Sequence, residues 1–103
     1  MATAFLGLPG RQAITNQTSV AIGTSGRPIR VFDCFVVSGG TASTLKLYNG
    51  TSATGSDYLQ VDGVINKSAN ALISSNGVLF PLGCYASVDA NATNVVVSYV
   101  QEL

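Results

Sequence analysis

The chain has 103 residues, of which 47% are hydrophobic and only 10% are charged, and its five basic residues balance its five acidic ones. An average soluble domain has about 25% charged residues, so neutral hydroxyl and amide side chains fill most polar positions here. The length fits one domain. The neutral balance leaves no basic stripe for phosphate contacts, which argues against nucleic-acid binding.

The first 17 residues follow no strand-like alternation. Their apolar run, Ala4 to Leu8, is too short for a signal-peptide core or a membrane span, so we expect synthesis in the cytoplasm and no membrane contact. A short apolar terminus needs something to cover it. We therefore predict an N-terminal arm over residues 1–17; the alternative is a first strand that packs on its own sandwich. The candidate partner-contacting residues of the arm are Phe5, Leu6, Leu8 and Pro9, with Arg11 as a hydrogen-bond donor at the rim.

Residues 18–103 are predicted to form a single domain of strands separated by turns, because no helical periodicity of useful length occurs. A short strand is expected at 18–22. The strongest candidate is 28–38, where both alternating series are apolar, so we expect cover on both of its faces. One series holds Ile29, Val31, Phe35 and Val37, and the other holds Phe32, Cys34 and Val36.

Later strands follow the same alternation. In 44–48 we expect Leu45 and Leu47 to point inward, and in 58–65 we expect Leu59, Val61 and Ile65 to do so. Seven or eight short strands spaced 8–12 residues apart predict an all-β antiparallel β-sandwich, jelly-roll-like or Greek-key. The remaining candidates are a weak strand at 71–74 and strands at 78–80, 84–89 and 94–101.

The chain has few of the residues and motifs that catalysis, nucleotide binding or metal binding requires. Without histidine, no ordinary base stands ready to activate a serine or cysteine nucleophile. The aspartates are scattered, and the glycine-rich turns lack the spacing and lysine of a nucleotide loop. We predict no enzyme, no cofactor and no metal site. Cys34 and Cys84 are expected to be buried thiols, with a disulfide between facing strands as the alternative.

Three tyrosines, Tyr48, Tyr58 and Tyr85, fall on the polar series of their strands. Aromatic rings can stack on sugars, although tyrosines more often anchor interfaces or cover strand edges. They are candidates for a secondary interface or for glycan contacts.

Three segments of the second half carry a resemblance. They are Thr44-Leu45-Lys46-Leu47-Tyr48-Asn49-Gly50, Leu82-Gly83-Cys84-Tyr85-Ala86-Ser87-Val88 and Asn94-Val95-Val96-Val97-Ser98-Tyr99-Val100. Over residues 43–101 the chain resembles small β-sandwich virion proteins of tailed bacteriophages, although Cys84 stands where leucine is frequent and Phe80-Pro81 shortens the preceding strand. Residues 1–42 carry no such likeness. The resemblance implies a capsid cement or decoration protein, or a fibre or neck component, without activity or cofactor.

The leading hypothesis is a non-enzymatic phage virion structural protein, made in the host bacterial cytoplasm, that binds and stabilises the outer capsid surface. Its expected partners are the major capsid protein or another virion protein, and other copies of itself, with a trimer favoured. One alternative is a fibre, neck or tail component of the virion. An alternative of another class is a carbohydrate-binding β-sandwich module that uses Tyr48, Tyr58 or Tyr85.

Overall fold

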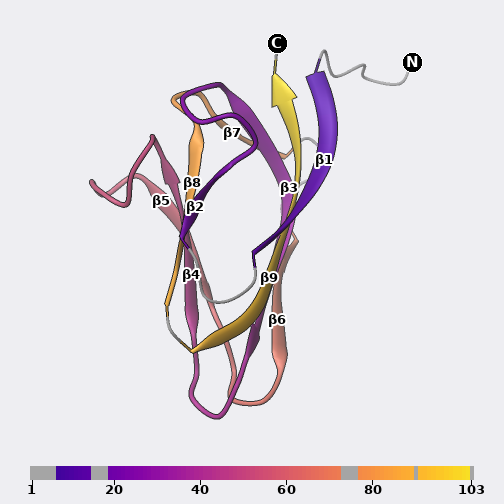
Figure 1. Ribbon diagram of the computed structural model, residues 1–103, viewed down its shortest axis with the longest axis vertical. Coiled ribbons are helices and arrows are strands. Elements are labelled where there is room, and N and C mark those ends of the chain that lie inside the picture. Colours follow the sequence, from indigo (N-terminus) through magenta and orange to yellow (C-terminus); the bar gives the residue numbers. More distant parts are fainter. Residues whose placement is uncertain (1–6, 15–18, 73–76, 90, 103) are drawn as a thin grey trace.

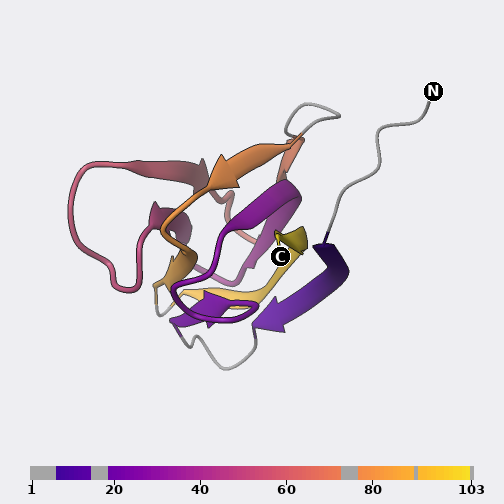
Figure 2. The ribbon, with the colours of Figure 1, turned by 90° about the horizontal axis from the view of Figure 1, so that it is seen from above.

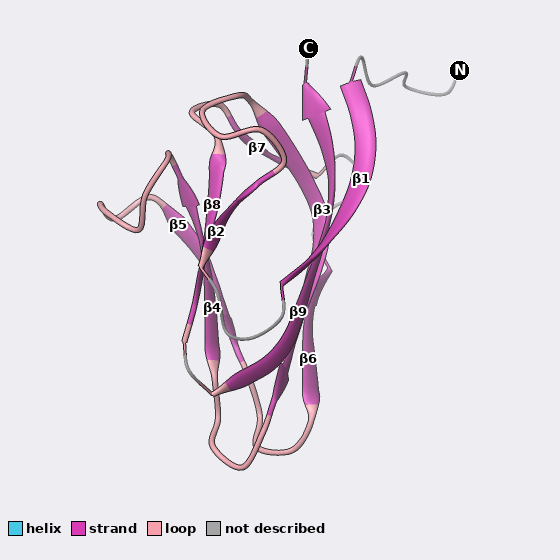
Figure 3. Ribbon diagram, in the orientation of Figure 1, coloured by secondary structure: helices cyan, strands magenta, loops and turns pink. Residues whose placement is uncertain are grey.

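The computed structural model describes residues 7–14, 19–72, 77–89 and 91–102. Within these residues the chain forms strands and loops, without a helix (Figure 3). Nine strands are described, and they form two antiparallel sheets that pack face to face (Figure 1). The predicted antiparallel β-sandwich is confirmed.

The two sheets draw their strands from all along the chain. The larger sheet has the order β1 (Gly7–Ile14), β9 (Ala92–Glu102), β3 (Ile29–Ser38) and β6 (Ser68–Leu72), with β7 (Val78–Phe80) also paired to β3. The smaller sheet has the order β2 (Val20–Ile22), β8 (Cys84–Val88), β4 (Thr44–Asn49) and β5 (Tyr58–Asp62).

The core lies between the sheets and is built from the inward series of each strand. Each fully buried valine, leucine or isoleucine contributes about 1.5–3 kcal/mol relative to leaving it exposed. The larger sheet supplies Ile29, Val31, Cys34, Val36, Val95 and Val97, and the smaller sheet supplies Ile22, Leu45, Leu47, Val61, Cys84 and Ala86.

A β-bulge in β3 changes the predicted alternation. The buried residues are Ile29 and Val31 before the bulge but Cys34 and Val36 after it. The register against β9 shifts between Val31 and Asp33, so Phe32 is the additional residue. Within the described residues one face of this strand lines the core, and the other is the half-buried outer surface of the sheet, so cover of the second face by a partner stays a prediction.

The segment predicted as an arm contains β1. Residues Gly7–Ile14 pair with β9 along their whole length, from Gly7 opposite Glu102 to Ile14 opposite Val95. Seen from above, β1 (indigo) lies beside β9 (yellow) at one edge of the larger sheet (Figure 2). The alternative, a first strand on its own sandwich, therefore describes residues 7–14. Phe5, Leu6 and residues 15–17 lie outside the described residues, and partner contact by this segment stays a prediction.

β5 ends earlier than predicted, at Asp62. The next residue, Gly63, donates its backbone N–H to the Ser43 carbonyl at 2.7 Å. A Cβ on Gly63 would meet the Ser38 hydroxyl and would lie 2.9 Å from Ser43, so the chain can pass here only without a side chain. Beyond this point Ile65 is 51% exposed, so its predicted inward position was wrong.

β6 begins at Ser68, three residues before the weak strand predicted at 71–74, and ends at Leu72. It forms there because Ser68 and Ala69 pair with Val37 and Val36 of β3.

Candidate functional site

The outer face of the smaller sheet carries three cross-strand rows of side chains from β5, β4 and β8. One row is Tyr58, Tyr48 and Tyr85, and the next is Gln60, Lys46 and Ser87. In the third row Asp62 pairs with Thr44, and the Asp89 carboxylate accepts the Thr44 backbone N–H. We call this surface the tyrosine face; it comprises Thr44, Lys46, Tyr48, Tyr58, Gln60, Asp62, Tyr85, Ser87 and Asp89.

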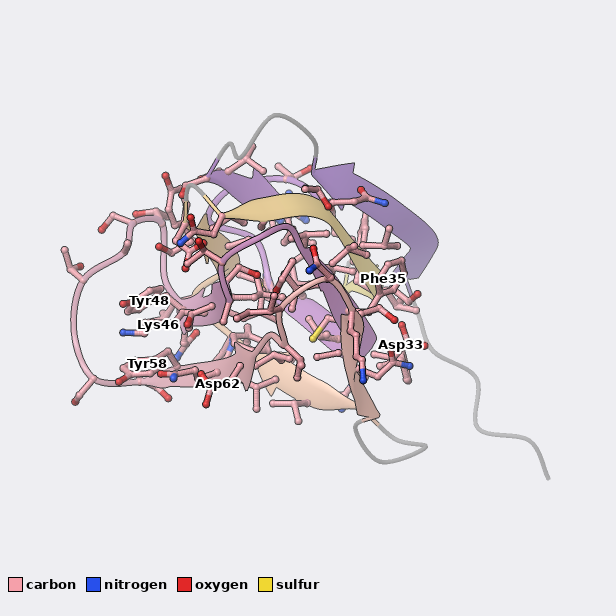
Figure 4. The ribbon with its side chains drawn as sticks, turned by 90° about the horizontal axis from the view of Figure 1, so that it is seen from below. Asp33, Phe35, Lys46, Tyr48, Tyr58 and Asp62 are labelled. Carbon is pink, nitrogen blue, oxygen red and sulfur yellow. The ribbon has the colours of Figure 1, made fainter. Side chains whose placement is uncertain are left out.

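The aromatic row is packed at β4 and β5. The Tyr48 and Tyr58 ring centroids lie 5.1 Å apart with the planes tilted by 47°. Such a pair contributes about 0.5–1.5 kcal/mol beyond burial. The Lys46 Nζ lies 4.8 Å from the Tyr58 ring centroid, a cation–π contact. Lys46, Tyr48, Tyr58 and Asp62 project from the same side of the sandwich (Figure 4).

A hollow of about 360 Å³ lies on this face, lined by Thr44, Lys46, Tyr48, Gln60, Ser87 and Asp89. The Asp89 carboxylate at its rim is held by two backbone donors. Its Oδ2 accepts the Thr44 N–H at 2.8 Å and its Oδ1 accepts the Asn91 N–H at 2.9 Å. Because each carboxylate oxygen has two acceptor positions, Asp89 keeps capacity for a further donor.

The structure brings together the three tyrosines that the sequence singled out. Sequence reasoning placed each on a polar series but missed their adjacency and the polar residues beside them. One sequence pattern could have predicted this adjacency. Apolar and polar residues alternate in the same way in Leu-Lys-Leu-Tyr, before the 50–57 loop, and in Tyr-Leu-Gln-Val-Asp, after it. Folded as a hairpin, these two stretches align Tyr48 with Tyr58, as observed.

The outer face of the larger sheet has a different chemistry. Phe35 of β3 stands opposite Val96 of β9, and Val37 lies two residues further along β3; all three are half-buried. We call Phe35, Val37 and Val96 the apolar face. In Figure 4, Phe35 and Asp33 lie on the opposite side of the sandwich from Tyr48. The neighbouring outward residues are one carboxylate, Asp33, and the amides and hydroxyls of Ser68, Asn70, Asn94 and Ser98.

The expected arm residues Leu8, Pro9 and Arg11 lie on β1, in the same sheet as the apolar face. In the register, Pro9 stands opposite Val100 and Arg11 opposite Ser98. β1 therefore continues this sheet beyond β9.

A second hollow, of about 370 Å³, lies where Tyr58 and Leu59 of β5 approach Val78, Leu79 and Pro81. Val78 and Leu79 are both well exposed. This hollow is more apolar than the one on the tyrosine face, and it shares Tyr58 with that face.

Cys34 and Cys84 are buried thiols, each 1% exposed, as the sequence predicted. Burial, and secondarily the neighbouring Cys34, raise the pKa of Cys84 from 9.0 to about 12. The thiol therefore stays protonated at neutral pH, which makes it a poor nucleophile.

The described residues offer two outer surfaces, one polar and tyrosine-rich and one apolar. In this part of the chain, no group of three or more cysteine, aspartate or glutamate side chains is placed to hold a metal ion, and no helix is long and apolar enough to cross a membrane. A scan against protein-family models finds no matching family, and no curated protein matches the chain.

Proposed function

We propose that the chain is a non-enzymatic structural protein of a tailed-phage virion, a cement protein that binds the outer capsid surface and reinforces the shell. The apolar face is the observation that carries this proposal. Phe35, Val37 and Val96 stand on the outside of a sheet, where a lone two-layer sandwich ordinarily presents polar residues to water. An outer sheet face of this kind favours a neighbouring protein surface.

The residues around the apolar face keep the free-energy cost of burying it in an interface low. Apart from Asp33, its outward neighbours are amides and hydroxyls, which lose less hydration energy on burial than charged side chains would. The whole chain has the same character, since only 10% of its residues are charged. The resemblance of residues 43–101 to small virion proteins points in the same direction.

The position of β1 supports a contact through the N-terminal segment. Phe5 and Leu6 directly precede Gly7, the first residue of β1, in the sequence. We propose that this segment and β1 contact the same partner as the apolar face. Specific interfaces bury about 800 Å² per partner, and repetition over a shell multiplies modest affinities.

The proposed partners are the major capsid protein or another virion protein, together with further copies of this chain in a trimer. A fibre, neck or tail role uses the same surfaces. Copy number separates the two roles: mass spectrometry of purified virions should find many copies per particle for cement and few for a fibre.

The binding test replaces Phe5 and Leu6 together by aspartate. We expect the wild-type chain to bind virions stripped of it, and Phe5→Asp/Leu6→Asp to lose binding by at least about tenfold, because two charges enter a desolvated contact. The matched control is Thr51→Asp/Ser52→Asp, in the exposed β4–β5 loop. Co-sedimentation measures binding, and circular dichroism checks the fold. Unchanged shell occupancy by the Phe5/Leu6 variant would show that the arm is not the contact, and a wild-type chain that ignores the particles contradicts the cement role.

A further inference from the structure

Every side chain that defines the tyrosine face carries a hydrogen-bonding group. The described register places three phenols, two carboxylates, an ammonium, an amide and two alcohols there, with no aliphatic side chain among them. The apolar face has the opposite composition. The two faces therefore suit different ligands.

The hollow on this face has the size of a small-ligand site. Its volume of about 360 Å³ lies at the lower end of the range of about 300–1,000 Å³ for ligand pockets. Tyr48, only 8% exposed and packed against Tyr58, is its aromatic wall. The other lining residues are polar, so the hollow combines one apolar surface with several hydrogen-bonding groups.

The polar groups of the hollow match a ligand whose hydroxyls both donate and accept. Lys46 only donates and Asp89 only accepts, whereas Gln60, Thr44 and Ser87 do both. Asp89 is already fixed by the Thr44 and Asn91 backbone N–H groups, so little side-chain entropy is lost when a ligand binds it. Lys46 is held near its position by the Tyr58 ring.

The charges of the tyrosine face select against acidic ligands. Asp62 and Asp89 outnumber Lys46, and the Asp62 carboxylate is engaged by the Gln60 amide at 2.7 Å. An added carboxylate or phosphate would meet two like charges against one opposite charge. A neutral ligand avoids this repulsion.

We infer that the tyrosine face binds a neutral saccharide at the hollow beside Tyr48. A hexose unit places an apolar C–H group against the small exposed part of the Tyr48 ring and its hydroxyls beside Lys46, Gln60 and Asp89. The face binds the sugar without changing it. This inference concerns the smaller sheet and does not depend on the proposed virion role, which rests on the larger sheet.

The first experiment applies the full chain to an array of neutral and acidic oligosaccharides. We expect binding to neutral hexose or N-acetylhexosamine oligosaccharides and weaker binding to glucuronate- or sialate-containing ones. The strongest neutral ligand is then titrated into isotope-labelled protein, with amide shifts expected on β4, β5 and β8.

Two variants test the residues. Gln60→Ala and Lys46→Met each remove a hydrogen-bonding group, and Lys46→Met keeps the apolar stem; each should weaken binding of that ligand by about tenfold. The matched control, Asn70→Ala, removes an exposed amide on the outer face of the other sheet and should bind like the wild-type chain.

Several results overturn the inference. The first is that no neutral oligosaccharide on the array binds, and the second is a preference for acidic glycans. The third is that both variants bind with wild-type affinity. If Gln60→Ala and Lys46→Met instead abolish binding to the shell, the tyrosine face belongs to a protein partner. A chain that binds virions through the larger sheet but no glycan rejects the saccharide site and leaves the cement role standing.

Discussion

Cys84 couples the stability of the core to pH at the scale of a single residue. Its folded-state pKa of about 12 lies above the ordinary value of 9.0, because burial disfavours the thiolate. Between these two values the folded state holds the proton that the unfolded state releases. The stability contribution of the protonated thiol is therefore complete below about pH 9 and is lost as pH rises towards 12.

We predict that the free energy of unfolding falls with a slope of about 1.4 kcal/mol per pH unit from this residue alone between pH 9 and 12. Urea unfolding at several pH values measures it. Tyrosines and lysines titrate in the same range, so the quantity compared is the difference between the wild-type chain and Cys84→Ala. A constant difference across this range would contradict the assignment to Cys84.

Single residues also show how far the sequence could predict the fold. Strict alternation correctly placed Leu45, Leu47 and Val61 in the core, since each lies in a regular part of its strand. Ile65 follows the same period but is exposed, because the chain turns at Gly63 beneath Ser38 and Ser43. That close approach joins segments 20 or more residues apart, and local periodicity carries no information about it.

Among the elements, β3 shows the effect of one additional residue on a strand. Its bulge lies where its neighbour changes, with β7 paired to Ile29–Val31 and β6 paired to Asp33–Val37. Gly77, with φ +71°, fits beside it: a Cβ there would lie 2.8 Å from the Val31 carbonyl oxygen. The bulge accommodates Phe32 as an additional residue. The residues before and after the bulge therefore keep the same inward face, as the buried side chains of Val31 and Cys34 show.

Deleting Phe32 should therefore leave a regular strand that keeps its buried series, at a cost of about 1–3 kcal/mol for lost contacts. Deleting Phe35 should prevent cooperative folding, because it turns Val36 outward and Val37 inward. Thermal unfolding followed by circular dichroism compares the two variants. Equal loss of structure in both would argue against this account of the bulge.

β1 illustrates an element that sequence patterns miss. Gly7, Pro9 and Gly10 are depleted in strands, so the segment looked unlike one. Proline is tolerated at a sheet edge because it need not donate to a second neighbour, and β1 is an edge strand beside β9. Position at the edge is a property of the whole sheet, which explains why the segment alone did not reveal it.

On the scale of the whole molecule, the two outer faces predict which variants lose virion binding. The apolar face should lie against the capsid, so Val96→Lys should bind stripped virions at least about tenfold more weakly than the wild-type chain, because burying its ammonium costs several kcal/mol. Gln60→Lys, on the tyrosine face, should bind like the wild-type chain. Co-sedimentation measures both variants, and light scattering should give about three times the 10.6 kDa mass of one chain for the wild type and for both variants. Equal virion binding by Val96→Lys and Gln60→Lys, or a monomeric wild-type chain, would contradict the prediction.

The candidate site also belongs to this scale. The sequence assigned Tyr48, Tyr58 and Tyr85 to the polar series of three strands, which needs only local alternation. Their contiguity depends on the order β8-β4-β5 and on its register, which bring Tyr85 beside Tyr48 across 37 positions of chain. This strand pairing depends on how the strands of both sheets pack together in the folded molecule.

The place of β9 between β1 and β3 has a consequence for biogenesis. The strands on either side of it are synthesised first, yet they share no pairing until β9 emerges from the ribosome. β3 can pair with β6 and β7 before then, so β9 completes the larger sheet last, after a delay in which one edge of β3 has no neighbouring strand. Distant pairings of this kind slow folding and invite aggregation, so nascent chains should depend on holdase chaperones until that last strand is made.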